Sequence, residues 1–197
     1  MPAVSNGQLI TIGIEAVVNN VTNGYNLEGK VTVGSTITGS YTYDTDTLDT
    51  NPTSFIGGYS YNSSSCGITL NIDELVFYTN IYNVDFRMTI VNDSPDIPGD
   101  GYSWCSYNNN DLDNGAKVDS IYWQLIDNTG TALSSTALPT TAPVLSDWAY
   151  NDLSISGPGY GSDYFFIGAT VTSAVLIPEP ATLLLFSIGT LLLRKSR

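Results

Sequence analysis

Hydrophobic residues recur at every second position along much of this chain, and this period limits its local structure more than any other feature of the sequence. In Leu9–Val18 the apolar side chains share one face of an extended chain, and in Val84–Val91 they alternate with Asp85, Arg87 and Thr89. Successive side chains of a β-strand point to opposite faces of a sheet, whereas a helix repeats about every 3.6 residues. Both segments are therefore predicted to be strands that bury one face.

Other segments rich in β-branched and aromatic residues extend the pattern, and stretches rich in Asn, Asp, Gly, Pro and Ser separate them as turns. The further predicted strands are Lys30–Val33, Ser35–Asp44, Cys66–Asp73, Val118–Ile126 and Tyr164–Val175, the last of which we expect near the centre of its sheet. Short strands without intervening helices predict an all-β fold, an antiparallel β-sandwich of jelly-roll or Greek-key type. An open barrel is the alternative.

The charge of the chain is strongly negative, with 19 acidic residues against six basic ones and a formal net charge of −13. Such a surface repels phosphate backbones, so nucleic acid is not expected as a partner. The chain also contains no histidine, which removes the commonest general base and metal ligand. We therefore predict a protein that is not an enzyme.

Two cysteines, Cys66 and Cys105, are the only thiols in the chain. In an oxidising compartment they could close a disulfide across a loop of roughly 40 residues, which stabilises a fold by about 4 kcal/mol. In a reducing compartment they would be two buried or half-buried thiols. Both alternatives are left open by the sequence.

The C-terminal end differs from the rest of the chain and has three parts in series. Pro178, Glu179 and Pro180 come first, followed by an uncharged apolar run at 181–193 and a basic end with Arg194, Lys195 and Arg197. A 13-residue helix would be about 20 Å long, shorter than the roughly 30 Å hydrocarbon core of a bilayer. It can still insert if the basic side chains snorkel and the bilayer thins. The positive-inside rule then orients the basic end toward the cytoplasm.

This tripartite end, Ile177 to Arg197, resembles the sorting domain of PEP-CTERM proteins, the proposed substrates of exosortase. The resemblance implies a body at 1–176 and a sorting signal at 177–197, divided into the Pro-Glu-Pro motif (177–180), a single short transmembrane helix (181–193) and a basic tail (194–197). It also implies processing near Pro178-Glu179-Pro180 by an exosortase-type membrane enzyme. The precursor is expected in the inner membrane, and the processed protein at the cell surface or outside the cell.

Proteins of that family carry an N-terminal signal peptide. Residues 1–9 have neither a basic region nor an apolar core of the kind a signal peptide needs. We therefore expect a signal peptide to lie upstream of Met1, and the alternative is that this chain is not exported.

One acidic loop has a spacing that could serve a cation. Asp44, Asp46 and Asp49 place alternating carboxylates on a turn-rich segment, and hard cations collect oxygen ligands in this way. The segment lacks the glycine and the distal glutamate of an EF-hand loop, so calcium is a weak expectation and a solvated turn is the alternative. No other cofactor is expected.

Taken together, these features predict a structural protein of the cell surface or of an exopolysaccharide or biofilm matrix. An extracellular carbohydrate-binding module with exposed aromatic platforms is the alternative, and a glycan hydrolase with two facing carboxyl groups is a less favoured one. We expect Trp104, Trp123 and Trp148 to pack in the core or against a sheet.

Overall fold

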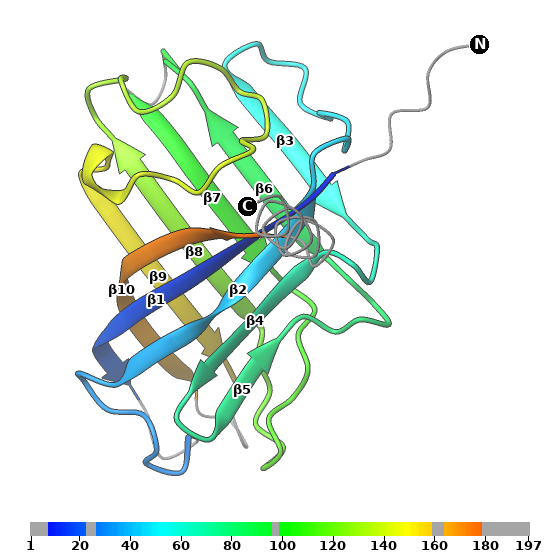
Figure 1. Ribbon diagram of the computed structural model, residues 1–197. Helices are drawn as coiled ribbons and strands as arrows, with labels where there is room; N and C mark the ends of the chain where they lie inside the picture. The colour runs from blue at the N-terminus through cyan, green and yellow to red at the C-terminus, as the bar shows by residue number, and fades with distance from the viewer. Residues whose placement is uncertain (1–7, 23–26, 96–98, 159–163, 179–197) are drawn as a thin grey trace, which may run out of the picture.

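The computed structural model describes residues 8–22, 27–95, 99–158 and 164–178 of the chain (Figure 1). These residues form ten β-strands, and no α-helix occurs among them. The strands are β1 (Leu9–Thr22), β2 (Thr36–Asp44), β3 (Ile56–Tyr61), β4 (Gly67–Ile72), β5 (Leu75–Tyr78), β6 (Phe86–Val91), β7 (Asp100–Ser106), β8 (Ser120–Asp127), β9 (Tyr150–Gly157) and β10 (Phe165–Ile177). A short 3-10 turn, η2 (Leu145–Asp147), lies between β8 and β9.

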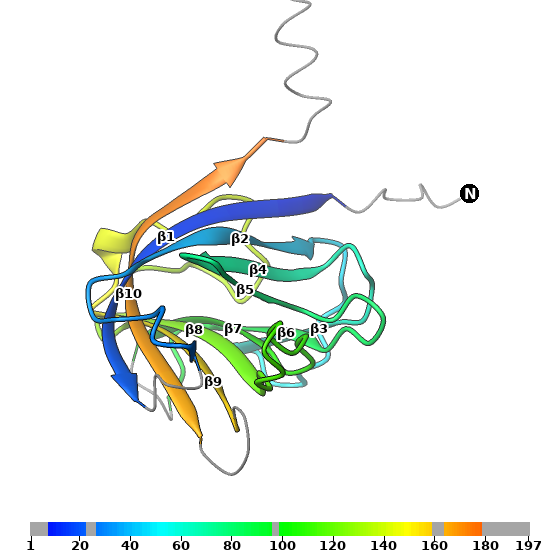
Figure 2. The ribbon, with the colours of Figure 1, turned by 90° about the horizontal axis from the view of Figure 1, so that it is seen from below.

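All ten strands belong to one antiparallel sheet, in the order β3-β6-β7-β8-β9-β10-β1-β2-β4-β5. The sheet folds over on itself. Figure 2 shows β1, β2, β4 and β5 as one wall and β9, β8, β7, β6 and β3 as the facing wall, joined on the side where β10 pairs with β1. The result is a half-barrel with β3 and β5 at its two edges.

The prediction of an all-β antiparallel fold is confirmed, but the two separate sheets of a sandwich are replaced by one continuous sheet. The open barrel named as the alternative is the closer description. Two long strands explain the difference, because β1 has 14 residues and β10 has 13. Their pairing shifts register between Glu15 and Ala16 and again between Val18 and Asn20. Such bulges bend and twist a strand, so the sheet curves where a sandwich would divide.

The core between the two walls is aromatic. Tyr41 on β2 lies 5.2 Å from the ring of Trp104 on β7 and 6.0 Å from that of Trp123 on β8. The hydroxyl groups of Tyr41 and Tyr102, both buried, lie 2.7 Å apart in a hydrogen bond between the walls. Ring pairs in such geometry contribute about 0.5 to 1.5 kcal/mol each beyond the area they bury.

Loops cover parts of both edges of the half-barrel. At the β5 edge, the N–H of Asn110 donates to the carbonyl of Tyr78 at 3.0 Å, and the N–H of Asn80 donates to the carbonyl of Asn108 at 2.8 Å. At the β3 edge, the N–H of Thr50 donates to the carbonyl of Gly58 at 2.9 Å. These contacts satisfy backbone groups that an open sheet edge would leave unpaired.

Candidate functional site

The predicted sorting signal begins where the last strand ends. Ile177, the final residue of β10, still pairs with Thr11 of β1, and Pro178 after it is exposed. Glu179, Pro180, the apolar run at 181–193 and the basic residues Arg194, Lys195 and Arg197 lie outside the described residues. The division of the chain near residue 177 is thus compatible with the limits of the sheet.

Within the described residues, no helix combines the length and apolarity that crossing a bilayer requires. The expected transmembrane segment at 181–193 is not among these residues, so it stays a prediction.

The C-terminal half of β10 pairs with another strand on one side only, and the short turn η2 also contacts β10. β9 pairs with β10 from Phe165 to Ala169, whereas β1 continues alongside β10 as far as Ile177. Beyond Ala169 a single side chain ends the pairing with β9: the amide nitrogen of Asn151 donates to the carbonyl of Val171 at 2.7 Å, and its oxygen accepts from the N–H of Val171 at 3.3 Å. Asn151 thereby takes the place of one residue of a neighbouring strand.

The acidic loop after β2 uses its carboxylates to hold backbone. Asp44 accepts a hydrogen bond from the N–H of Asp46 at 2.9 Å, and Asp49 accepts from the N–H groups of Asn51 and Gly58 at 2.8 Å each. These are the contacts of an Asx turn, which the alternative of a solvated turn predicts. In the described part of the chain, no three acidic or cysteine side chains lie close enough together to hold a metal ion. Calcium binding stays a prediction.

Two buried carboxylates organise the long connection between β8 and β9, a role that the sequence does not reveal. Asp100 and Asp127 are paired across β7 and β8, and their exposed fractions are 2% and 3%. Asp127 accepts from the N–H groups of Thr129, Thr131 and Ala132, and Asp100 accepts from Leu133 at 2.7 Å. Hydrogen bonds from the backbone of Thr131 and Thr129 are the main reason that the pKa of Asp127 falls from 3.8 to about 2.

The two cysteines are buried free thiols, so the disulfide is not formed in this structure. Cys105 pairs with Arg87 and Tyr122 in the sheet register and shares their outward face, while Cys66 belongs to the core cluster inside the sheet. Strand alternation explains this, because Trp104 before Cys105 occupies the inward position. Burial raises the pKa of both thiols, which disfavours the reactive thiolate.

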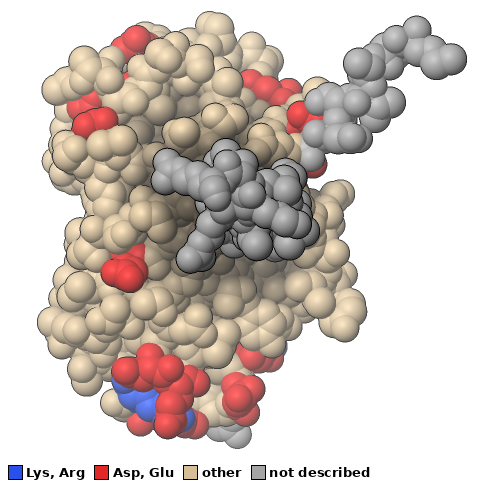
Figure 3. All heavy atoms as spheres, viewed as in Figure 1, with Lys and Arg blue, Asp and Glu red and all other residues tan. Residues whose placement is uncertain are grey.

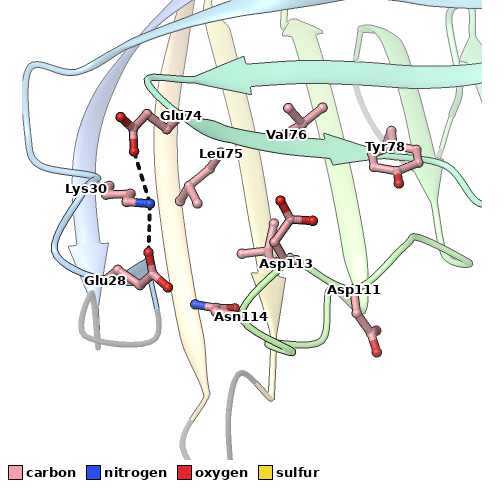
Figure 4. A pocket seen from close by; sticks show the side chains of 10 residues that line it. Glu28, Lys30, Glu74, Leu75, Val76, Tyr78, Asp111, Asp113 and Asn114 are labelled. Carbon is pink, nitrogen blue, oxygen red and sulfur yellow. Dashed lines mark ion pairs between the residues drawn. The ribbon is translucent and has the colours of Figure 1, made fainter.

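One hollow on the described surface is acidic. It has a volume of about 280 Å³ and lies between β5, the segment before Lys30 and the loop at 111–114 (Figure 4). Four carboxylates line it, from Glu28, Glu74, Asp111 and Asp113. The ammonium group of Lys30 lies 2.7 Å from Glu28 and 3.2 Å from Glu74. We call this feature the acidic hollow.

Lys30 is held as a cation in the acidic hollow. Hydrogen bonds to Glu28 and Glu74 raise the pKa of Lys30, and the hydrogen bond to Lys30 lowers that of Glu28. A protonated amine is not a nucleophile or a base. Figure 3 shows acidic side chains in separate groups on one face of the molecule, with basic atoms inside one of these groups. The hollow therefore carries a net negative charge, which repels anions.

The tryptophans are in the core, as the sequence predicts. Trp104, Trp123 and Trp148 have exposed fractions of 1%, 0% and 9%, so none presents a flat ring to solvent. The most exposed aromatic side chain among the described residues is Tyr82, at 93%. The ring pairs found among these residues lie in the core.

Comparison with known proteins yields no relative for this chain. No protein-family model matches the sequence, no curated protein matches it, and no solved structure matches its fold. The functional argument therefore depends on the residues of the chain itself.

Proposed function

We propose that this protein is an exported bacterial surface or extracellular-matrix protein, in which the half-barrel is the displayed domain and residues 178–197 are the sorting signal. One observation carries the proposal: the order Pro178-Glu179-Pro180, an uncharged apolar run and a basic end follows directly after the last strand. A C-terminal apolar strand or core helix would not need a basic cluster at the chain end.

Each part of this signal has a separate physical task. The apolar run retains the precursor in the membrane, Arg194, Lys195 and Arg197 hold the end in the cytoplasm, and the proline-flanked Glu179 is the processing determinant. Prolines disfavour helix and keep the chain extended, which suits binding in the cleft of a processing enzyme. Exopolysaccharide is the expected surrounding of the displayed domain.

The described part of the half-barrel supports a structural role. Three of its carboxylates, those of Asp49, Asp100 and Asp127, hold loop backbone in place. Its one hydrogen bond between buried tyrosines joins the two walls. These polar groups stabilise the domain and leave no evident role in chemistry.

Replacement of Glu179 tests the proposal. In a host that has the processing enzyme, with a signal peptide placed upstream of Met1, Glu179→Ala should insert normally and accumulate as uncut precursor, because the apolar run is unchanged. Thr182→Ala is the matched control and should be processed like the wild type. Immunoblots of membrane and extracellular fractions measure both. Release of a trimmed Glu179→Ala protein at the wild-type rate would show that the tail is only a short anchor.

A further inference from the structure

The half-barrel has a third stretch of unpaired strand in addition to the edges at β3 and β5. It is the side of β10 that faces away from β1, from Thr172 to Ile177, and we call it the free edge of β10. β9 has already separated from β10 at Ala169, and Asn151 occupies only Val171. Figure 2 shows this end of β10 extending from the body beside β1.

The pairing with β1 determines to which side each residue of this edge points its backbone N–H and carbonyl groups. Val18 directs its backbone toward β2, because its N–H donates to Ser35 and its carbonyl accepts from Gly34. Directions alternate along a strand, so the odd-numbered residues from Thr11 to Glu15 face β10. Their partners are Ser173, Val175 and Ile177.

Ala174 and Leu176 must then point their N–H and carbonyl groups away from β1. Within the described part of the chain, no hydrogen bond reaches these backbone groups from another residue. Ala174 and Leu176 are two positions apart, and each has an N–H and a carbonyl group available for a hydrogen bond. An added β-strand, antiparallel or parallel, requires this pattern.

The free edge also lacks the protection that the other two edges have. The β5 edge lies beside the carboxylates of the acidic hollow, and the β3 edge is contacted by Asp49 and Thr50. In contrast, β10 contains no charged residue in its sequence FFIGATVTSAVLI. Its last three side chains, Val175, Leu176 and Ile177, are 55%, 45% and 44% exposed. An uncharged, apolar and unpaired edge is a template for strand addition.

The side chains at this edge are already held in place. Val175 and Ile177 lie over Gly13, close enough that a Cβ there would meet Ile177 Cδ1 at 3.2 Å and Val175 Cγ2 at 3.5 Å. Leu176 is on the opposite face, opposite the buried Ile12. A partner strand would therefore meet apolar side chains on both faces of a preformed strand.

We propose that the free edge of β10 is the docking strand for the membrane enzyme that processes the tail, which binds it by adding a strand of its own. This inference rests on the proposed function. We choose this enzyme as the partner because of the sequence that follows the free edge. Pro178 comes directly after the edge, and the apolar run begins at residue 181. At about 3.3 Å per extended residue, Ile177 lies within roughly 13 Å of the membrane segment.

Charge supports the same occupant. The described body is strongly acidic and is repelled by anionic headgroups, whereas the free edge carries no charge. The free edge can thus approach the membrane surface at little electrostatic cost. The enzyme would then recognise both Pro178-Glu179-Pro180 and the strand before it.

The test removes one free backbone donor. Leu176→Pro deletes the N–H that points away from β1 and keeps the pairing with β1, and proline is tolerated at such edge positions. Leu176→Ala is the matched control, since it shortens the side chain and keeps the donor. In the full chain with a signal peptide, pulse-chase labelling should show processing slowed about fivefold for Leu176→Pro, the effect expected of one net hydrogen bond. The control should stay within about twofold of the wild type.

A second variant guards against a folding defect. Leu176→Lys leaves the backbone intact and places a charge at an exposed edge position, which blocks strand addition, so it should slow processing by a similar factor. Melting temperatures of the released domain, measured for every variant, should match the wild type.

The outcomes separate this inference from the proposed function. If Leu176→Pro and Leu176→Lys are processed at the wild-type rate while Glu179→Ala accumulates uncut, the docking strand is wrong and the sorting signal stands. If Glu179→Ala is also trimmed normally, the sorting signal is wrong as well. A change from dimer to monomer in sedimentation, without slower processing, would assign the edge to a second copy of the chain and overturn the proposal.

Discussion

Single carboxylates, and not clusters of them, hold the long connection between β8 and β9. This connection runs over residues 128–149 with only the short turn η2 inside it. Asp127 and Asp100 fix its first residues, and the carbonyls of Thr136 and Pro139 accept from the hydroxyls of Tyr59 and Tyr43 at 2.8 and 2.7 Å. A loop of this length is otherwise uncommon in a compact domain. Burying an acid here is favourable because its charge is met by several N–H donors.

Replacing Asp127 should reveal this role through pH. The folded carboxyl has a pKa of about 2 against 3.8 unperturbed, so folding favours the ionised form. Its contribution to stability is complete above the unperturbed pKa and is lost as pH falls toward the folded one. Asp127→Asn should therefore lower the melting temperature at neutral pH and flatten its decline between about pH 4 and pH 2. The exposed Asp147→Asn is the control. Parallel declines for the two variants would contradict the assignment.

The sequence predicted which side chains point into the core. It did not predict which polar side chains hold backbone in place through hydrogen bonds. Alternation correctly placed Ile10, Ile12 and Ile14 on one buried face, because burial on a strand follows a period of two. The roles of Asp127 and Asn151 depend on backbone groups that come close only in the folded sheet. The acidic hollow is of the same kind, since Glu28, Glu74 and Asp113 lie on separate segments.

Six of the ten strands overlap segments that the alternation predicted, whereas β3, β5, β7 and β9 were missed. β6 and β8 lie within two residues of their predicted ends. The sequence of β3, IGGYSY, is rich in glycine, which weakens the strand signal. β7 was missed because Cys105 and Ser106 are buried on both of its faces beside Trp104, which removes the alternation. The predicted strand Lys30–Val33 is not a strand in the structure.

The paired strands β2 and β4 approach each other closely at Gly39, which allows a test of how tightly the curved sheet is packed. A Cβ added to Gly39 would lie 2.1 Å from the carbonyl oxygen of Thr69 and 2.8 Å from Leu70 Cα, and both are backbone atoms that cannot turn aside. Gly39→Ala should destabilise the domain by about 1 to 3 kcal/mol. Gly13→Ala, whose Cβ would meet only side-chain atoms of Ile177 and Val175 at 3.2 to 3.5 Å, should change stability by less than about 0.5 kcal/mol. Urea unfolding measures both, and equal stabilities would contradict the packing described.

The domain and its tail are physically separable in this account. The sheet closes its core with β10, and the last residue of that strand still pairs with β1. A chain that ends at Pro178 should therefore give a far-UV circular dichroism spectrum dominated by strand and should unfold cooperatively. A chain that ends at Val171 loses the pairing of β10 with Thr11 to Glu15 and should melt at a lower temperature. Equal melting temperatures, or a spectrum dominated by helix, would contradict this division.

Mass spectrometry of the mature protein recovered from outside the cell tests the central claim most directly. The account predicts a chain that has lost residues 181–197, ends within or next to Pro178-Glu179-Pro180, and keeps Cys66 and Cys105 as free thiols. The intact mass and the C-terminal peptide report all three. Recovery of a protein that still ends at Arg197, or its confinement to the cytosol of a host with the processing enzyme, would contradict it.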